Sequence, residues 1–279
     1  MKGFRSAALC VLPCLALVGG PAFLPPAASA QAPVDLELVI AVDVSLSMDI
    51  DEQRVQRDGY VAAFRDREIH RAITSGAHGR IAVIYMEWAG PPSQSVVVPW
   101  TIIDGPDAAR GFADRLERAP ISRMRMTSIS SALSYSKGLF ETSGVKGVRR
   151  VVDVSGDGPN NSGPTVMYIR DDLLASGIVI NGLPIMLKEA ASMSMFDIRD
   201  LDRYYMDCVI GGPGSFVVPV RTVDEFRTAI HRKLLLEIAG REAPPPARII
   251  RVQGAAREEA ADCMVGERQW RRYLEGVPN

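Results

Sequence analysis

The sequence predicts an α/β fold, a doubly wound and mostly parallel sheet with helices on both faces and one antiparallel edge strand. Apolar segments rich in β-branched residues alternate with amphipathic segments along most of the chain. Several of the apolar segments are nearly continuous, which is typical of strands covered on both faces. A carboxylate and two hydroxyls directly follow the first of them, where open α/β sheets place their ligands.

The strands are expected where short apolar runs are bounded by turn residues. They are residues 36–42, 80–86, 149–155, 178–180 and 216–220, with residues 95–100 pairing antiparallel with the second as an edge strand. Helices are expected at residues 52–73, 107–119, 128–140, 165–176 and 222–239. Thr222 and Glu225 form a capping box for the last helix, whose apolar stripe contains Phe226. Residues 183–206 show no regular pattern.

Residues 1–30 indicate a cleaved secretory signal. Lys2 and Arg5 precede an apolar stretch, and residues 28–30 (Ala-Ser-Ala) provide the small-x-small pattern of a signal peptidase site. The apolar stretch is too short and too interrupted by proline for a good membrane span. We therefore expect a mature chain that starts near Gln31, is periplasmic or secreted, and has no membrane insertion after cleavage. A retained N-terminal anchor is the alternative.

Length and charge limit what the mature chain can be. Removing Lys2 and Arg5 takes the formal net charge from −1 to about −3, a nearly balanced value that does not favour nucleic acid as a partner. About 250 residues suffice for one α/β domain, residues 31–240, followed by an extension, residues 241–279, that is too short for a core of its own.

Two cysteines remain after the signal segment is removed. In an oxidising compartment, Cys208 and Cys263 are a disulfide candidate. Such a bond would hold the extension against the domain, where Trp270, Tyr273 and Leu274 suggest that it docks.

Asp43, Ser45 and Ser47 carry the main functional signal. They stand at alternate positions after the first strand, so an extended backbone would point all three to one side. Small hard oxygen donors that converge in this way suit Mg²⁺ or Mn²⁺. The alternative is that the three side chains only cap the following helix and satisfy a loop.

Residues 43–47 (DVSLS) resemble the D-x-S-x-S element of the von Willebrand factor type A (vWA) domain, which carries a metal-ion-dependent adhesion site (MIDAS). Thr127, just before an amphipathic helix, is similar to the threonine of the family's second loop, and Asp157, after a buried strand, to the aspartate of its third. The three elements occur in the family's order with similar separations. The chain also resembles exported bacterial proteins that carry this domain alone.

The resemblance implies a ligand set and a role. Ser45, Ser47 and Thr127 would contact the metal directly, and Asp43 and Asp157 would act through water. Neutral hydroxyls leave much of the charge of the ion uncompensated, so its open position can take an external carboxylate. The implied function is divalent-metal-dependent binding of a protein that presents an acidic residue. This adhesion or scaffold role outside the cytoplasm requires no chemical conversion.

Other classes have weaker support. The chain lacks a dinucleotide-binding glycine motif after its first strand, a nucleophile elbow and a phosphate-binding loop. A haloacid-dehalogenase-like phosphatase would need an acid at the position of Ser45. His70, His78 and His231 are scattered and do not indicate zinc. A Mg²⁺-dependent phosphohydrolase and a metal-free structural periplasmic module remain the alternatives.

The partner surface is expected on the loops around the metal. Arg123 and Arg125 lie beside Thr127, and Asn160 and Asn161 follow Asp157. Arginines near a cation-anchored carboxylate would favour an acidic partner. The asparagines could instead only shape a turn. The same surface would carry part of the stretch with Met186, Met193 and Met195, although these methionines could equally fill gaps beneath a loop.

Several other acids have an expected structural role. Asp153, in the middle of a strand, is interpreted as a buried acid paired with an arginine, or otherwise as a support for the metal residues. Asp49, Asp51 and Glu52 could form a second cation site, but negative charge at a helix N-terminus explains them more simply.

Overall fold

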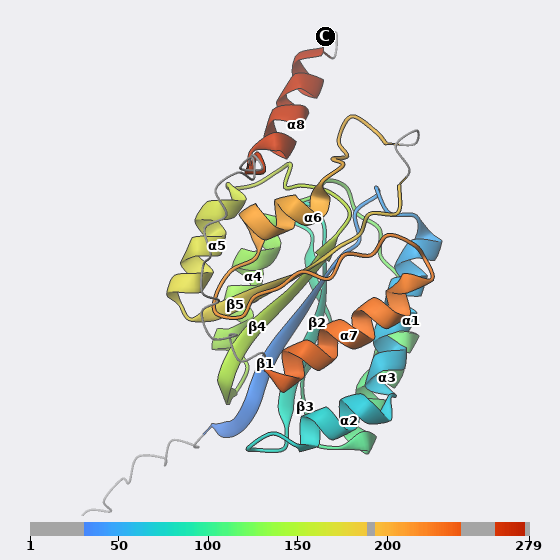
Figure 1. The fold of residues 1–279 in the computed structure, drawn as a ribbon, viewed down its shortest axis with the longest axis vertical. Coiled ribbons are helices and arrows are strands. Elements are labelled where there is room, and N and C mark those ends of the chain that lie inside the picture. Colours follow the sequence, from blue (N-terminus) through green and yellow to red (C-terminus); the bar gives the residue numbers. More distant parts are fainter. Residues whose placement is uncertain (1–30, 189–192, 241–259, 277–279) are drawn as a thin grey trace, which may run out of the picture. The chain divides into compact units, whose positions relative to one another are not determined.

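The structure, a computed structural model, describes residues 31–188, 193–240 and 260–276. The predicted signal segment and the proline run at residues 244–246 lie outside the described residues. The strands form one five-stranded sheet in the order β3-β2-β1-β4-β5 (Figure 1). They are β1 Ala32–Asp43, β2 Ile81–Trp88, β3 Gln94–Ile103, β4 Val145–Gly156 and β5 Ile178–Pro184. Only the β2–β3 pairing in this sheet is antiparallel, which confirms the predicted fold class.

Helices cover both faces of the sheet, as Figure 1 shows. One group packs together on one face: α1 Ile50–Phe64, α2 Arg67–Thr74, α3 Pro106–Arg118 and α7 Glu225–Ala239. The second group lies on the other face: α4 Ile129–Glu141, α5 Val166–Ala175, α6 Leu201–Tyr204 and the π-helical turn η1 Tyr205–Val209. The last helix is α8 Val265–Gly276.

Strand β1 shows why two helical layers form. Leu38 and Ile40 belong to the hydrophobic core shared with α1 and α7, whereas Val39 and Ala41 belong to the core shared with α4 and α5. Successive side chains of a strand point to opposite faces, so a continuous apolar run needs cover on both sides. β1 is the central strand of the sheet, so its carboxyl end, at Asp43, lies in the middle of the edge formed by the strand ends.

The expected helix at residues 52–73 is two helices in the structure. Helix α1 ends at Phe64, and Asp66 begins α2 by accepting a hydrogen bond from the backbone N–H of Glu68 at 2.7 Å. An aspartate at an N-cap competes with continuation of the preceding helix. At the start of α1, Asp49 and Glu52 form a capping box, which confirms the helix N-terminus interpretation.

Two other expectations near the C-terminal half were wrong. Residues 216–220 lie parallel to β5 but make only isolated bridges with it. The N–H groups of Gly182 and Met186 donate to this segment, whereas Pro184 between them has no N–H to continue the ladder. Strand β5 continues to Pro184, so Asn181 lies inside it rather than at its end. The capping box of α7 is half formed: Glu225 accepts from the N–H of Thr222 at 3.2 Å, while Asp224 is the N-cap.

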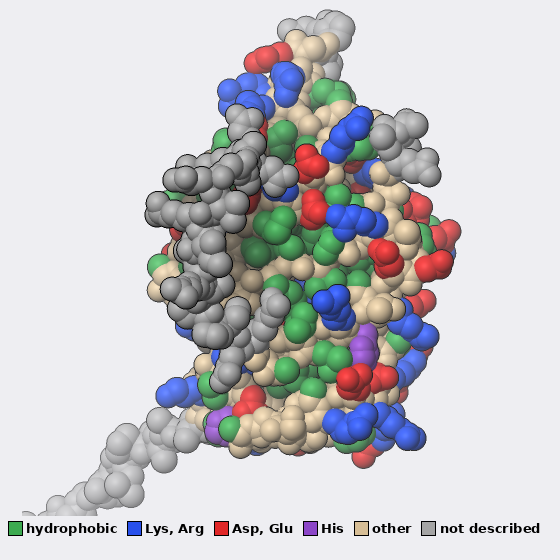
Figure 2. All heavy atoms as spheres, viewed as in Figure 1, with side chains coloured by type: hydrophobic (Ala, Val, Ile, Leu, Met, Phe, Trp, Pro, Cys, Tyr) green, Lys and Arg blue, Asp and Glu red, His purple; other side chains and the backbone are tan. Residues whose placement is uncertain are grey.

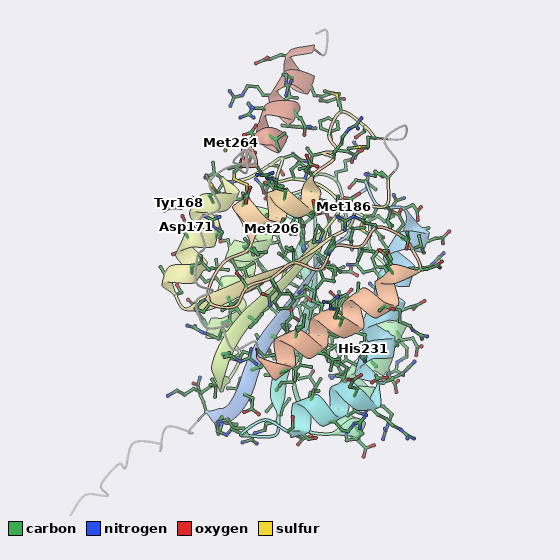
Figure 3. All side chains as sticks on the ribbon, in the orientation of Figure 1. Tyr168, Asp171, Met186, Met206, His231 and Met264 are labelled. Carbon is green, nitrogen blue, oxygen red and sulfur yellow. A yellow bond between two sulfur atoms is a disulfide. The ribbon has the colours of Figure 1, made fainter. Side chains whose placement is uncertain are left out.

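A disulfide bond joins Cys208 of η1 to Cys263, as predicted, with 5.4 Å between the Cα atoms. The N–H of Ala261 donates to the carboxylate of Asp207 at 2.8 Å, next to this bond. Figure 3 labels Met264, which immediately precedes α8. The described part of the extension is therefore attached to the domain by covalent and polar contacts.

Asp153 is buried in an ion cluster, but its partner is a lysine and not the expected arginine. Lys233 of α7 lies 2.6 Å from Asp153 and also pairs with Glu237, one helical turn away. Tyr60 donates to Asp153 at 3.2 Å, and Asn181 donates to Glu237 at 3.2 Å. Burial, followed by the charge of Asp153, raises the pKa of Glu237 to about 7.

Two further features of the described residues are the distribution of surface charge and the length of the helices. On the face drawn in Figure 2, acidic and basic side chains are interspersed and do not form a large patch of one sign. Within residues 31–188, 193–240 and 260–276, no helix is both long and apolar enough to cross a bilayer.

Candidate metal centre

The candidate metal residues come from three chain segments that meet at one edge of the sheet. Asp43 ends β1, and Asp157 follows the end of the neighbouring strand β4. The hydroxyl of Ser47 donates to Asp157 at 2.6 Å and lies 2.7 Å from the hydroxyl of Ser45. The Ser45 N–H donates to Asp43 at 2.7 Å. The pairing of β1 with β4 thus brings these four residues together.

Thr127 is held by the loop that follows Asp157. Its N–H donates to the side-chain oxygen of Asn161 at 3.0 Å, and its carbonyl accepts from the N–H of Asn161 at 2.9 Å. Met126, just before it, has a φ of 70°, an uncommon conformation for a residue other than glycine. Thr127, Ser45 and Ser47 line the same groove. The structure therefore places all five predicted residues at one site.

Asp43 is the least satisfied of these residues. Its side chain is fully buried, and its Oδ2 has no hydrogen-bond partner among the described residues. Burial and then the negative charge of Asp157 raise its pKa well above the ordinary value. The close approach depends on Gly156, because a Cβ there would lie 2.9 Å from both Asp43 Oδ2 and the hydroxyl of Tyr205. The sheet edge thus holds a buried carboxylate that needs positive charge.

Lys188 provides part of that charge, but to the other aspartate. Its amino group lies 3.0 Å from Asp157 Oδ2 and 2.8 Å from Asp197. Burial disfavours the ammonium, but the two carboxylates outweigh it and raise the pKa of Lys188. Among the residues that the structure describes, no basic side chain lies within ion-pair distance of Asp43. The donor set, two carboxylates and three hydroxyls, fits a hard divalent cation.

The expected partner-binding residues divide into two groups. Arg125 is exposed and lines the groove with Asn161. Arg123 is exposed, but its guanidinium also donates to the carbonyls of Leu46 and Met48, at 3.2 and 2.8 Å, and so braces the loop that carries the serines. These three residues surround the site and remain candidates for contact with a partner.

Asn160 was expected on the partner-binding surface, but in the structure it is fully buried. Its side chain accepts from the N–H of Ser130 at 3.0 Å and donates to Glu267 of α8 at 2.8 Å. Its amide therefore connects α4 to the extension and offers no surface to a partner. Sequence alone cannot separate this role from that of Asn161, because the two asparagines are adjacent.

The three methionines expected near the site also differ in their exposure. Met186 and Met193 line a cavity of about 80 Å³ between Asp157 and the residues before α6, and Figure 3 shows Met186 near the end of the sheet that carries the site. Met195 is 52% exposed. Met186 also packs against the hydrophobic core that β1 shares with α4 and α5, which agrees with gap filling, whereas Met195 is the exposed member of the set.

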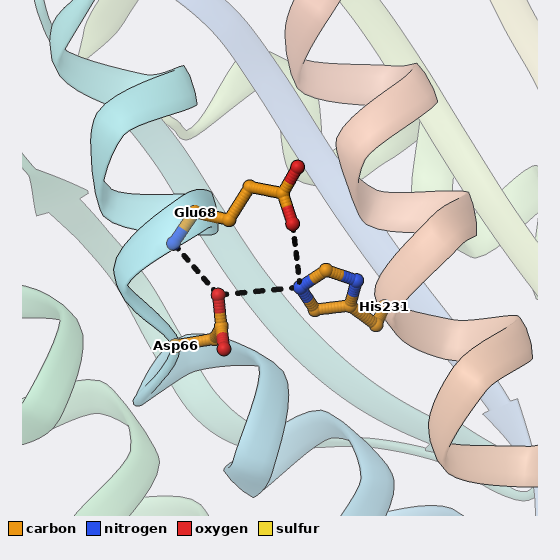
Figure 4. A group of neighbouring side chains, drawn as sticks. All are labelled: Asp66, Glu68 and His231. Atoms are coloured by element: carbon orange, nitrogen blue, oxygen red, sulfur yellow. Dashed lines mark hydrogen bonds and ion pairs between the residues drawn. The ribbon is translucent and has the colours of Figure 1, made fainter.

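Sequence reasoning missed one feature beside the site and one between helices α2 and α7. Lys188 and Phe196 lie in the irregular stretch, where no pattern indicates which side chains turn inward. It also missed that His231 meets Asp66 and Glu68, whose ligand atoms all lie within 4.8 Å of one another (Figure 4). His231 Nε2 is 3.3 Å from Asp66, which also caps α2. These contacts link α7 to the start of α2.

The fold is that of the vWA class, as comparison with solved structures shows. The proximal thread matrix protein 1 (PTMP1) of the mussel byssus aligns with a TM-score of 0.53 and 12% identity, over 74% of this chain and 48% of that one. The pilus adhesin SpaC from Lactobacillus rhamnosus GG aligns with a TM-score of 0.53 and 13% identity, over 75% and 31%. A von Willebrand factor type A protein from Catenulispora acidiphila gives 0.50 and 15%, over 74% and 43%.

The chain belongs to the family described as "Protein of unknown function (DUF1194)", which matches residues 33–242. No curated protein matches the sequence. The chain spans less than half the length of each of the three structural relatives. At these identities the structural likeness establishes the fold, and one PTMP1 structure is described as having a zinc-occupied MIDAS motif.

Proposed function

We propose that this protein is a divalent-metal-dependent protein-binding module, of adhesion or scaffold type, that acts in the periplasm or outside the cell. The observation that carries the proposal is the buried carboxylate of Asp43, whose Oδ2 lacks a partner among the described residues. Its Oδ1 accepts from the N–H of Ser45, whose hydroxyl lies next to that of Ser47. Burying a carboxylate without a counter-charge is costly. A Mg²⁺ or Mn²⁺ ion would remove that cost.

The residues have distinct parts in this proposal. Ser45, Ser47 and Thr127 would provide neutral oxygen ligands, while Asp43 and Asp157 would provide the compensating charge. A bound ion would supply an electrophilic position for the carboxylate of a partner. Binding of this kind needs no chemical conversion, so we propose that the protein is not an enzyme.

The structural relatives support the proposal. SpaC is a pilus adhesin and PTMP1 a thread matrix protein, and a PTMP1 structure has zinc in its MIDAS motif. Adhesive and matrix roles in proteins of this fold are consistent with a binding module outside the cytoplasm. The choice of Mg²⁺ or Mn²⁺ for this chain rests on its own oxygen donors.

Affinity capture from periplasmic and culture extracts of the source organism would test the proposal. Mature wild-type protein should retain a partner in Mg²⁺ and release it in EDTA. Thr127→Ala should lose that capture, because it removes a ligand without opening the core. Asp107→Ala, at an exposed position in the first turn of α3, is the matched control and should capture normally. Equal capture in Mg²⁺ and in EDTA would contradict metal dependence. Mg²⁺-dependent release of phosphate from a model ester would indicate the phosphohydrolase instead.

A further inference from the structure

The groove beside the candidate metal residues has two walls of different character. It has a volume of about 490 Å³. Ser45, Ser47 and Thr127 lie on the polar side, and Phe196 and Trp270 contribute aromatic surface. This volume falls within the range of pockets that enclose a small ligand or one or two side chains.

The aromatic wall is built partly by the C-terminal extension. Trp270 of α8 packs on Phe196 with 5.7 Å between ring centroids, and Tyr273 stacks on Trp270 at 5.4 Å. Three aromatic rings in mutual contact form a preorganised apolar surface. Helix α8 is attached nearby through the Cys208–Cys263 disulfide. The extension therefore contributes directly to the groove.

The charged side chains that line the groove indicate which kind of ligand it can bind. Lys188 and Asp197 both line it, but they pair with each other at 2.8 Å. Arg125 also lines the groove, is exposed, and forms no ion pair with any described residue. Among the charged side chains that line the groove, Arg125 is thus the one without a described ion-pair partner, and it lies in the same groove as an apolar surface. This combination suits a ligand with both a carboxylate and a large apolar group.

We propose that the groove binds an extended peptide segment of the partner in which an acidic residue lies within three positions of a large apolar or aromatic residue. The acidic side chain reaches the metal centre and Arg125, and the apolar side chain packs on Phe196 and Trp270. This inference rests on the proposed function and narrows its partner class. The extension is then a specificity element and not only a brace for the domain.

Selection from a library of displayed random heptapeptides tests the inference without knowledge of the natural partner. Peptides are bound to the mature protein in Mg²⁺ and eluted with EDTA. We expect enrichment of an acidic residue with a large apolar neighbour. Affinity for the best synthetic peptide should fall about tenfold or more with Trp270→Ala, because buried aromatic anchors dominate such contacts. Trp270→Phe should keep part of the wild-type affinity for this peptide.

Leu274→Ala provides the matched control, because this residue lies on the same helix, is 57% exposed and does not line the groove. The Leu274→Ala variant should bind the synthetic peptide with the same affinity as the wild type. If the selected peptides carry an acid without apolar preference, or if Trp270→Ala binds as well as wild type, the groove inference is wrong and the metal-dependent function stands. If EDTA elutes no peptides from a protein that binds Mg²⁺, the groove inference is likewise overturned. Absence of Mg²⁺ binding overturns the proposed function itself.

Discussion

Two pairs of buried acidic side chains, each with one member in or just after β4, are compensated in different ways. Asp153 and Glu237, inside the core, share the ammonium of Lys233, which is itself buried. For Asp43 and Asp157, at the sheet edge, Lys188 is the one basic partner among the described residues, and it pairs with Asp157 but not with Asp43. The core cluster contains its own cation, whereas the edge cluster has a carboxylate that no described basic residue pairs with.

This difference indicates which cluster is structural and which is available for a ligand. A buried pair with an internal partner is stabilised without outside help, but losing that partner is costly. A carboxylate buried without such a partner shifts its pKa upward or gains a cation from solution. We therefore expect the core cluster to respond to mutation and pH but not to Mg²⁺. The edge cluster should respond to Mg²⁺.

The largest effect is expected from Lys233→Met. It leaves two carboxylates buried without a cation, so the free energy of unfolding should fall by about 3–5 kcal/mol. Chemical denaturation at pH 7 would measure the change. Lys137→Met removes a more exposed pair with Asp172 and should cost less than about 1 kcal/mol. Similar losses in the two variants would refute the distinction between the clusters.

The pH dependence of stability should come next in size. The pKa of Glu237 is raised to about 7 in the folded protein from an ordinary 4.5, so its contribution is complete below about 4.5 and is lost as pH rises through about 7. The loss should approach about 3 kcal/mol between pH 4.5 and 8. Denaturation curves at several pH values would show it.

Glu237→Gln should flatten that dependence, since the amide has no charge to desolvate, and exposed Glu141→Gln on α4 should not. In metal-free protein the raised pKa of Asp43 acts with the same sign. Mg²⁺ should counteract only the Asp43 part, because a cation favours the ionised carboxylate. If Glu237→Gln kept the full pH dependence, the assignment to the core cluster would fail.

A smaller effect is expected from Lys188→Met. Removal of an ammonium 3.0 Å from Asp157 should make the site more negative and strengthen Mg²⁺ binding about tenfold, or about 1.4 kcal/mol. Isothermal titration would measure the affinity, with Lys137→Met as the control. Unchanged or weaker binding would show that Lys188 does not compete with the metal for the charge of Asp157.

The sequence predicted the features that depend on local pattern. Continuous apolar runs located the strands, and the alternation of Asp43, Ser45 and Ser47 after such a run identified the edge where they lie. The disulfide followed from two remaining cysteines in a presumed exported chain. These features depend on periodicity, on the residues at which strands end and on residue chemistry, all of which are visible in the sequence.

Features set by tertiary packing could not be predicted in this way. Lys233 reads as a surface lysine in an amphipathic helix, yet it is buried against Asp153. Asn160 and Asn161 are identical in type, and only the path of the loop buries the first. Trp270 could be expected to dock, but its place in the groove depends on Phe196, from a segment without pattern.

Direct titration of Mg²⁺ or Mn²⁺ into the metal-free mature protein tests the central claim most directly. We expect one saturable site, and stabilisation of about 3 kcal/mol at a hundredfold excess over the dissociation constant. Asp43→Asn should abolish both, because it keeps the shape and removes the charge, whereas Asp107→Asn should change neither. A wild-type protein that binds no divalent cation at millimolar concentration, with an unchanged melting temperature, would contradict the account.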